Sequence, residues 1–192
     1  MVKNIMIVGV GGQGNLLTSR ILGNLILNEG LDVKLSEVHG MAQRGGSVTT
    51  FVRYGEKVYE PIIEEGDADI LISFEILEAQ RYQHFLKEDG VMIVNNQKID
   101  PIGVITRKEE YPKDAISQLK DKHRVIEVDS LNEALKLGNP RVFNTIILGV
   151  ISNYLEFELQ NWEETIRNTV PEKTIDLNLE AFYVGRSIQK EE

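Results

Sequence analysis

The fold is decided close to the N-terminus, by the segment Ile5-Met6-Ile7-Val8-Gly9-Val10-Gly11-Gly12-Gln13-Gly14. Its first four residues form a continuous apolar run that stops at glycines, which is typical of a strand buried on both faces of a parallel sheet. Gly9, Gly11 and Gly14 fit the G-x-G-x-x-G spacing, in which absent side chains let backbone amides approach a pyrophosphate. A helix is predicted over Asn15 to Asn28, and its dipole favours an anion at the loop. The same glycines suit a plain tight turn with close strand–helix packing, so the spacing leaves both interpretations open.

Strand and helix patterns alternate along the rest of the chain. Strands are predicted at 33–35, 48–54, 70–72, 91–94 and 125–128, and helices at 75–86, from 130 onward, at 141–155, 162–169 and 175–188. This alternation predicts an α/β fold, a Rossmann-like three-layer sandwich with a mostly parallel sheet and a helical C-terminal segment. Because no linker rich in Pro, Gly or Ser interrupts the chain, we expect a single domain over residues 1–192.

Four local patterns refine this expectation. Gly30 is expected to end the first helix, because glycine adopts the left-handed conformation easily. Gly55-Glu56-Lys57 is expected to turn the strand at 48–54 into a hairpin with Val58-Tyr59. Ser130 and Glu133 have the spacing of a capping box, which predicts a helix start. The helix at 141–155 carries apolar residues well beyond one stripe, so we expect it to be buried on more than one side.

Composition excludes several classes of protein. The 192 residues carry a formal net charge of −9, which argues against a sequence-nonspecific nucleic-acid binder, since such proteins need a basic surface. The chain has no cysteine, which excludes disulfides, cysteine-ligated zinc and an iron–sulfur cluster held by this chain. No run approaches the ~20 apolar residues of a membrane span. The N-terminal MVKNIMIVGV is too short for a signal peptide, so we expect a soluble cytoplasmic protein.

The segment Ser36 to Gly46 is the most unusual stretch and is predicted to be a polar loop. In a parallel sheet this loop leaves the carboxyl edge beside the glycine loop, where such folds bind ligands. His39 offers a titratable imidazole, Gln43 an amide, and Arg44 a permanent cation that suits an anion. His84 and His123, by contrast, are interpreted as ordinary surface residues.

Two further patterns bear on cofactors. Glu37 stands roughly where dinucleotide-binding folds place the acid that holds the ribose, although it is predicted to lie in the loop rather than at a strand end. Gly66-Asp67-Ala68 followed by Asn95-Asn96 imitates the thiamine diphosphate motif. The third glycine is missing and the acid runs straight into a strand, so we interpret this match as coincidental.

Taken together, the glycine loop and the stretch His39 to Val48, which reads HGMAQRGGSV, resemble the γ-type domain of 2-oxoacid:ferredoxin oxidoreductases. The second stretch favours the indolepyruvate type over the γ subunits of the pyruvate and 2-oxoglutarate enzymes. The similarity continues at Ala68-Asp69-Ile70, Glu75, Glu78-Ala79, Arg81-Tyr82, Asn95, and Asn178-Leu179-Glu180-Ala181-Phe182 with Gly185.

The resemblance implies a subunit of a complex that oxidatively decarboxylates an aryl 2-oxoacid, with coenzyme A as acyl acceptor and ferredoxin as electron acceptor. It implies a larger α subunit that holds thiamine diphosphate, magnesium and the iron–sulfur clusters, and no cofactor, metal ligand or catalytic residue in this chain. The isolated chain is then expected to be inactive. The residues expected to face a cofactor are Gly9, Gly11, Gly12, Gln13, Gly14, His39, Gln43 and Arg44.

Three alternatives stay open at this stage. The chain is also compatible with a γ subunit of a pyruvate or 2-oxoglutarate ferredoxin oxidoreductase, with a stand-alone NAD-dependent oxidoreductase, and with a nucleotide-sensing or scaffolding module. The extra Gly12 and the displaced Glu37 predict that the loop does not bind NAD tightly, whereas an anion on the amides of Gly12 to Gly14 is still expected.

Overall fold

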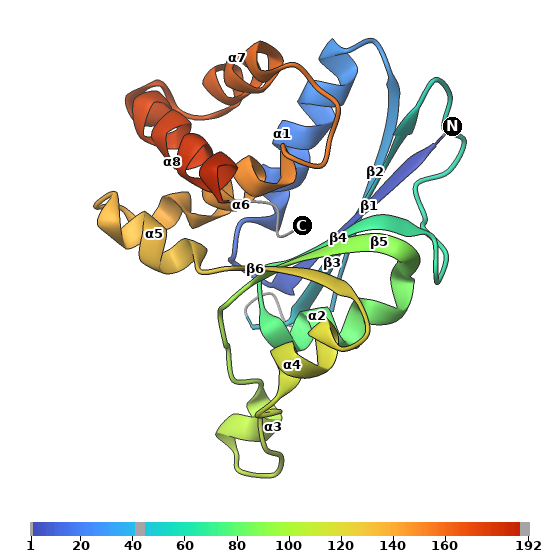
Figure 1. The fold of residues 1–192 in the computed structure, drawn as a ribbon, viewed down its shortest axis with the longest axis vertical. Helices are drawn as coiled ribbons and strands as arrows, with labels where there is room; N and C mark the ends of the chain where they lie inside the picture. The colour runs from blue at the N-terminus through green and yellow to red at the C-terminus, as the bar shows by residue number, and fades with distance from the viewer. Residues whose placement is uncertain (1, 41–44, 189–192) are drawn as a thin grey trace.

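The computed structural model describes residues 2–40 and 45–188 (Figure 1). Its sheet has six strands in the order β2-β3-β1-β4-β5-β6. Strands β1, β4, β5 and β6 run parallel, whereas β3 is antiparallel to both β1 and β2. The mostly parallel sheet is therefore confirmed. The strand bounds are Lys3–Val10 for β1, Asp32–His39 for β2, Ser47–Gly55 for β3, Ala68–Ser73 for β4, Leu86–Asn95 for β5 and Arg124–Val128 for β6.

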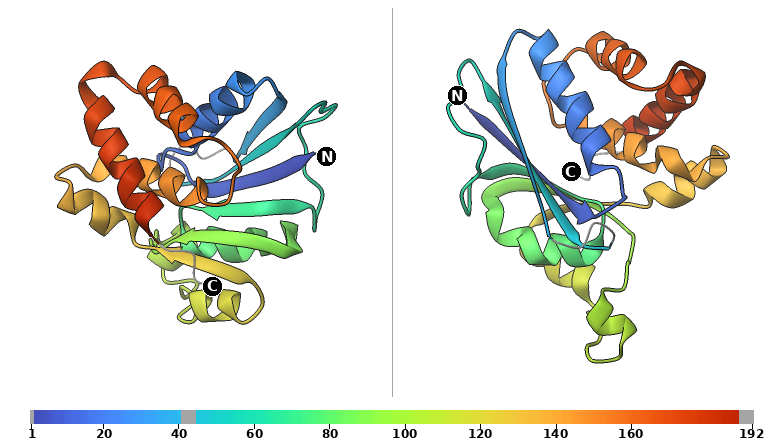
Figure 2. Two further views of the ribbon diagram at one scale, coloured as in Figure 1. Left: turned by 45° about the horizontal axis from the view of Figure 1, so that its top comes forward. Right: turned by 180° about the vertical axis from the view of Figure 1, so that it is seen from behind.

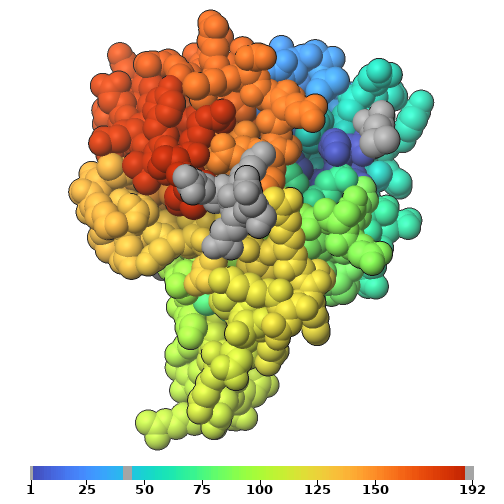
Figure 3. Space-filling view, viewed as in Figure 1, coloured from blue at the N-terminus to red at the C-terminus, as the bar shows by residue number. Residues whose placement is uncertain are grey.

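Helices cover both faces of the sheet, which confirms the three-layer sandwich (Figures 1 and 2). One face carries α1 (Asn15–Asn28), α5 (Ser130–Lys136), α6 (Phe143–Ile151), α7 (Leu159–Thr169) and α8 (Ile175–Ser187), and the other carries α2 (Ile76–Tyr82) and α4 (Ala115–Lys120). The segment around α3 (Ile102–Ile105) projects from the body (Figure 3). Short 3-10 helices occupy Gln83–Phe85, Pro140–Val142 and Glu172–Thr174. Among the helices of the described residues, none combines the length and the apolar character that a membrane crossing requires.

The apolar run of β1 explains why both faces are covered. Side chains alternate along a strand, so Ile5 and Ile7 enter the core under α1, α6 and α8, while Met6 and Val8 enter the core under α2 and α4. All four side chains are at most 1% exposed. The central strand thus needs a helical layer on each side, as its sequence predicts.

Helix α6 is buried on more than one side, as predicted, and other elements of the same chain cover it. Its residues from Asn144 to Ile151 are all buried, and α8 packs closely along it. Two glycines permit this approach, because a Cβ on Gly149 would overlap the carbonyl oxygen of Phe182, and one on Gly185 that of Ile146. The helix is shorter than predicted, since a 3-10 turn precedes it and it ends at Ile151.

The predicted boundaries around β2 and β3 are wrong in two places. The strand expected at 33–35 continues to His39, because β3 pairs with it from Asp32↔Gly55 to His39↔Val48, so residues 36–39 of the predicted polar loop belong to the strand. The expected hairpin with Val58-Tyr59 does not form, because β1 and β2 already occupy both edges of β3. The polar loop is therefore the connection of the β2–β3 hairpin.

Two helix ends complete the comparison with the sequence. Gly30 follows α1 in the left-handed conformation with φ 74°, as predicted. The start of α5 is also confirmed, but Ser130 is not its cap: Asp129 accepts from the Asn132 amide at 3.4 Å. The Ser130 hydroxyl instead donates to Asn95 Oδ1 at 2.6 Å and joins α5 to the end of β5.

Candidate functional site

A cleft of about 490 Å³ lies at the carboxyl edge of the parallel strands, between the glycine loop and the end of the β2–β3 hairpin. This is the edge at which open α/β sheets bind ligands. The cleft brings together Gly11, Gly12, Gly14 and His39 of the predicted site residues. Its full lining is Val10, Gly11, Gly12, Gly14, Asn15, Leu16, Glu37, His39 and Val48.

The glycine loop has a backbone that only glycine adopts easily. Gly12 and Gly14 have φ values of 102° and 93°, in the region that L side chains rarely enter. The Gly11 amide donates to Gly46 O at 2.9 Å, which fastens the loop to the start of β3. Gly9 lies behind the cleft, and a Cβ there would come within 2.9–3.1 Å of Asn15, Gln13 and Phe74 atoms.

Gln13 lies behind the cleft and holds the loop together. Its Oε1 accepts from the Val10 amide at 2.7 Å, and its Nε2 donates to Phe74 O and to Gln97 Oε1, both at 3.0 Å. The side chain is buried and is not part of the cleft lining. The polar atoms of Gln13 therefore form hydrogen bonds within the chain, and these bonds link the ends of β1, β4 and β5.

Several donors face the start of α1. Among the residues that the structure describes, none accepts a hydrogen bond from the amides of Gly12 and Gly14. Asn144, on α6, is 6% exposed and places its Nδ2 against Gly14, without a hydrogen-bond acceptor in the described part of the chain. Unused donors at a helix N-terminus form an anion-binding arrangement. Sequence reasoning missed Asn144, because the glycine loop lies 130 positions away from it.

The end of β2 supplies the two titratable groups of the cleft. Glu37 lies within this strand rather than in a loop, which corrects the prediction, and its Oε2 accepts from Thr50 Oγ1 at 3.4 Å. His39 is exposed, at the last position of the strand. The predicted site residues Gln43 and Arg44 lie outside the described residues.

A buried polar cluster supports the far side of the hairpin. Glu78, 2% exposed, accepts from Ser47 Oγ at 2.5 Å and from Arg81 at 2.7 Å. Burial raises the pKa of Glu78, with a smaller contribution from the Glu75 charge, against the lowering effects of Ser47 and Arg81. Glu75 in turn accepts from Tyr111 Oη at 2.5 Å and caps α2. The cluster fixes Ser47, the first residue after the polar loop.

The apparent thiamine motif is separated by the fold. Asp67 precedes β4 at the amino edge of the sheet, whereas Asn95 ends β5 at the carboxyl edge. The Asn95 side chain binds Ser130 and Phe74 O. Since the two residues lie at opposite edges, they do not fit one magnesium diphosphate site.

The sequence places the chain among known oxidoreductases. The family model for pyruvate ferredoxin/flavodoxin oxidoreductase matches residues 4–188. The chain belongs to this family. Within it, the chain is 42% identical over 187 residues to the indolepyruvate oxidoreductase subunit IorB of Archaeoglobus fulgidus, covering 95% of this chain and 92% of that protein. It is 39% identical to the IorB subunit of Thermococcus kodakarensis, covering 98% and 96%.

A second group of relatives is more distant. The common subunit gamma of the pyruvate/ketoisovalerate oxidoreductases of Pyrococcus abyssi is 32% identical, with 91% of this chain and 92% of that protein covered. The higher identity to the IorB subunits favours the indolepyruvate type over the pyruvate type. The relatives in both groups are subunits of multi-subunit oxidoreductases, and this chain is a subunit of the same kind.

Solved structures confirm the fold. The gamma subunit of a keto/oxoacid ferredoxin oxidoreductase from Geobacter sulfurreducens superimposes with a TM-score of 0.71 at 22% identity, covering 95% of each chain. A 2-oxoglutarate:ferredoxin oxidoreductase from Magnetococcus marinus, solved with 2-oxoglutarate, coenzyme A and succinyl-CoA, gives a TM-score of 0.76 at 18% identity. There the match covers 97% of this chain and 31% of the longer one.

Proposed function

We propose that this chain is the small subunit of an indolepyruvate ferredoxin oxidoreductase and works in the cytoplasm. In the proposed reaction an aryl 2-oxoacid loses its carboxyl group as carbon dioxide, the acyl group passes to the sulfur of coenzyme A, and two electrons pass to ferredoxin. The observation that carries the proposal is the 42% identity, over nearly the whole chain, to an indolepyruvate oxidoreductase subunit.

The larger α subunit holds thiamine diphosphate, magnesium and the iron–sulfur clusters in this proposal. The composition of the small chain supports the division, because it has no cysteine to ligate a cluster. The separation of Asp67 from Asn95 across the sheet supports it for the thiamine site. The small chain then contributes binding surface and orientation rather than the reacting cofactor.

The carboxyl-edge cleft is proposed to form one wall of the coenzyme A channel at the interface with the α subunit. The amides of Gly12 and Gly14 and the side chain of Asn144 offer donors for a phosphate group. His39 at the rim adds a group that donates or accepts a hydrogen bond near neutral pH. Arg44, in the adjoining connection, adds a permanent charge for a phosphate or a partner carboxylate.

Co-expression with the thiamine-dependent α subunit tests the proposal. The two chains are expected to purify together and to turn over indolepyruvate with coenzyme A, whereas the small chain alone is expected to be inactive and colourless. Turnover by the isolated chain, or visible absorption from a cluster in it, would overturn the proposal.

Substitutions test the assignment of the cleft. His39→Ala is expected to leave the stability unchanged within about 0.5 kcal/mol, because exposed positions rarely contribute more. Arg44→Ala is likewise expected to leave the fold intact. We expect them to weaken assembly or to raise the apparent KM for coenzyme A. The control Arg167→Ala removes an exposed arginine on α7 and is expected to change neither quantity. Wild-type assembly and kinetics in both cleft variants would contradict the assignment.

A further inference from the structure

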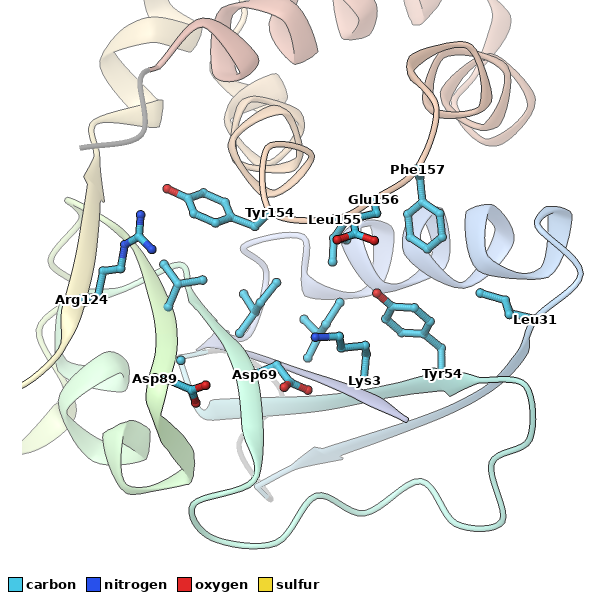
Figure 4. Close-up of a pocket in the computed structure, with 14 residues that line it drawn as sticks. Lys3, Leu31, Tyr54, Asp69, Asp89, Arg124, Tyr154, Leu155, Glu156 and Phe157 are labelled. Carbon is cyan, nitrogen blue, oxygen red and sulfur yellow. The ribbon is translucent and has the colours of Figure 1, made fainter. Parts of the chain in front are cut away.

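A second pocket lies at the amino edge of the sheet, between the first residues of the parallel strands and the connection from α6 to α7 (Figure 4). Its volume of about 460 Å³ is in the range of small-molecule sites. The carboxyl-edge cleft does not account for it, since the two lie at opposite ends of β1. The lining consists of Lys3, Ile5, Leu31, Tyr54, Asp69, Ile70, Asp89, Gly90, Val91, Arg124, Tyr154, Leu155, Glu156 and Phe157.

The floor of the pocket is apolar. Ile5 pairs with Ile70, and Ile70 with Val91, so three buried side chains form a row across β1, β4 and β5. At one end of the row, the rings of Tyr54 and Phe157 lie 5.8 Å apart between centroids. A flat apolar group is the kind of ligand that such a surface accommodates.

The hydroxyl of Tyr54 points into this pocket (Figure 4). The residue is 8% exposed, and its Oη makes no hydrogen bond to any other described residue. Burial, together with the Asp69 and Glu156 charges, raises the pKa of Tyr54 to about 12, so the group stays a donor at neutral pH. A buried donor of this kind calls for an acceptor on a ligand.

Charges of both signs border the floor. Lys3 and Glu156 lie on opposite walls, near the hydroxyl of Tyr54 (Figure 4). Within the described residues neither forms an ion pair, whereas Asp69 is already paired with Lys87 at 2.8 Å. A ligand that carries one positive and one negative group complements the charges of Lys3 and Glu156.

We propose that the amino-edge pocket binds a free amino acid with an aryl side chain. Its carboxylate accepts from Lys3 and the Tyr54 hydroxyl, its ammonium group donates to Glu156, and its ring lies on the row formed by Ile5, Ile70 and Val91. The proposal is independent of the function assigned to the carboxyl edge, since it uses none of the residues of that cleft.

Calorimetry on the full chain tests this site, with L-tryptophan and L-phenylalanine as probes. We expect saturable binding of one molecule per chain. Two analogues that each lack one charge, indole-3-propionate and tryptamine, are expected to bind at least about fivefold more weakly, since each loses one charged contact. No saturation by either amino acid up to about 10 mM would overturn the proposal.

Matched variants assign the contacts. Tyr54→Phe keeps the ring and is expected to weaken L-tryptophan binding about three- to tenfold. Glu156→Gln is expected to weaken L-tryptophan binding but to leave indole-3-propionate unchanged. Tyr59→Phe and Glu158→Gln are exposed controls outside the lining and are expected to bind as the wild type does. Wild-type affinity in both pocket variants would overturn the assignment.

Discussion

The cleft at the carboxyl edge of the sheet and the pocket at its amino edge are lined by different kinds of residues. At the carboxyl edge, three of the nine residues that line the cleft are glycines of one loop, in which Gly12 and Gly14 have positive φ. At the amino edge, the pocket is lined by large and charged side chains from five strands and two connections. The glycine loop of the cleft is encoded by closely spaced residues. The amino-edge pocket is instead formed by side chains that lie far apart in the sequence and are brought together by the sheet.

This contrast predicts different sensitivities to mutation. The glycine loop at the carboxyl edge depends on backbone conformations that few residues adopt, so substitutions of Gly12 and Gly14 are expected to damage the fold. The amino edge depends on chemical groups, so substitutions of the same shape are expected to change binding with little effect on stability.

The largest effect is expected from Gly14→Ala. The new Cβ meets Asn144 Nδ2 at a position with φ 93°, so strain and overlap add. We expect a loss of about 3 kcal/mol in the free energy of unfolding, measured with urea. Gly12→Ala is the control, because it has the same kind of φ but open space, and its loss is expected to be about 1–2 kcal/mol. Equal losses of unfolding free energy at the two positions would show that the Asn144 side chain moves away from the new Cβ without destabilising the fold.

Gln13→Ala is expected to cost about 2 kcal/mol, because it leaves the Val10 amide without its acceptor behind the loop. Gln97→Ala removes only one partner of Gln13 and is expected to cost under about 1 kcal/mol. Urea unfolding of both variants checks the order. If the Gln13→Ala chain keeps its stability and loses only ligand binding, Gln13 contacts the ligand and does not stabilise the loop.

The pH dependence of stability is expected to have opposite signs at the two edges. Burial raises the pKa of Glu78, so the unfolded state releases this proton first and the wild type loses stability relative to Glu78→Gln as the pH rises above about 4. At the start of β2, hydrogen bonds from Lys34 and from the Val58 amide lower the pKa of Asp32 to about 2. Its contribution is present above about pH 4 and is lost as the pH falls toward 2. Urea titrations of Glu78→Gln and Asp32→Asn across this range check both signs, and a parallel trend in the two variants would contradict them.

The smallest effect is expected for the addition of NAD, which we expect to bind only weakly. Glu37 lines the cleft from within β2, but the cleft also contains the extra Gly12, and we expect no low-micromolar affinity. Calorimetry of the full chain with NAD measures this directly. A low-micromolar dissociation constant would favour a stand-alone dinucleotide enzyme.

The sequence predicted the parts of the fold that local patterns encode. The apolar run of β1, the helix at Asn15–Asn28 and the left-handed Gly30 all follow from neighbouring residues, and all three are confirmed. The extension of β2 to His39 was missed, because its polar residues pair along an edge strand and this pairing is decided by β3. The failed hairpin at Val58-Tyr59 has the same origin, since a strand with two occupied edges accepts no third neighbour.

The candidate site was predictable to a similar degree. The glycines and His39 were identified because a contiguous motif encodes them, and the cleft contains Gly11, Gly12, Gly14 and His39. Asn144 and the amino-edge pocket were missed, because only the packing of α6 and the register of the strands bring their residues together.

The most direct test of the account compares the two edges in one assembled complex. Because the chain has no cysteine, His39→Cys and Asp89→Cys each introduce a single thiol, at exposed positions on opposite edges. Alkylation of each thiol is followed by mass spectrometry of this chain, free and bound to the α subunit. Assembly is expected to slow alkylation at His39→Cys by at least about tenfold and to leave alkylation at Asp89→Cys within about twofold of the rate in the free chain. Unchanged reactivity at His39→Cys, with protection of Asp89→Cys, would contradict it and place the α subunit on the amino edge.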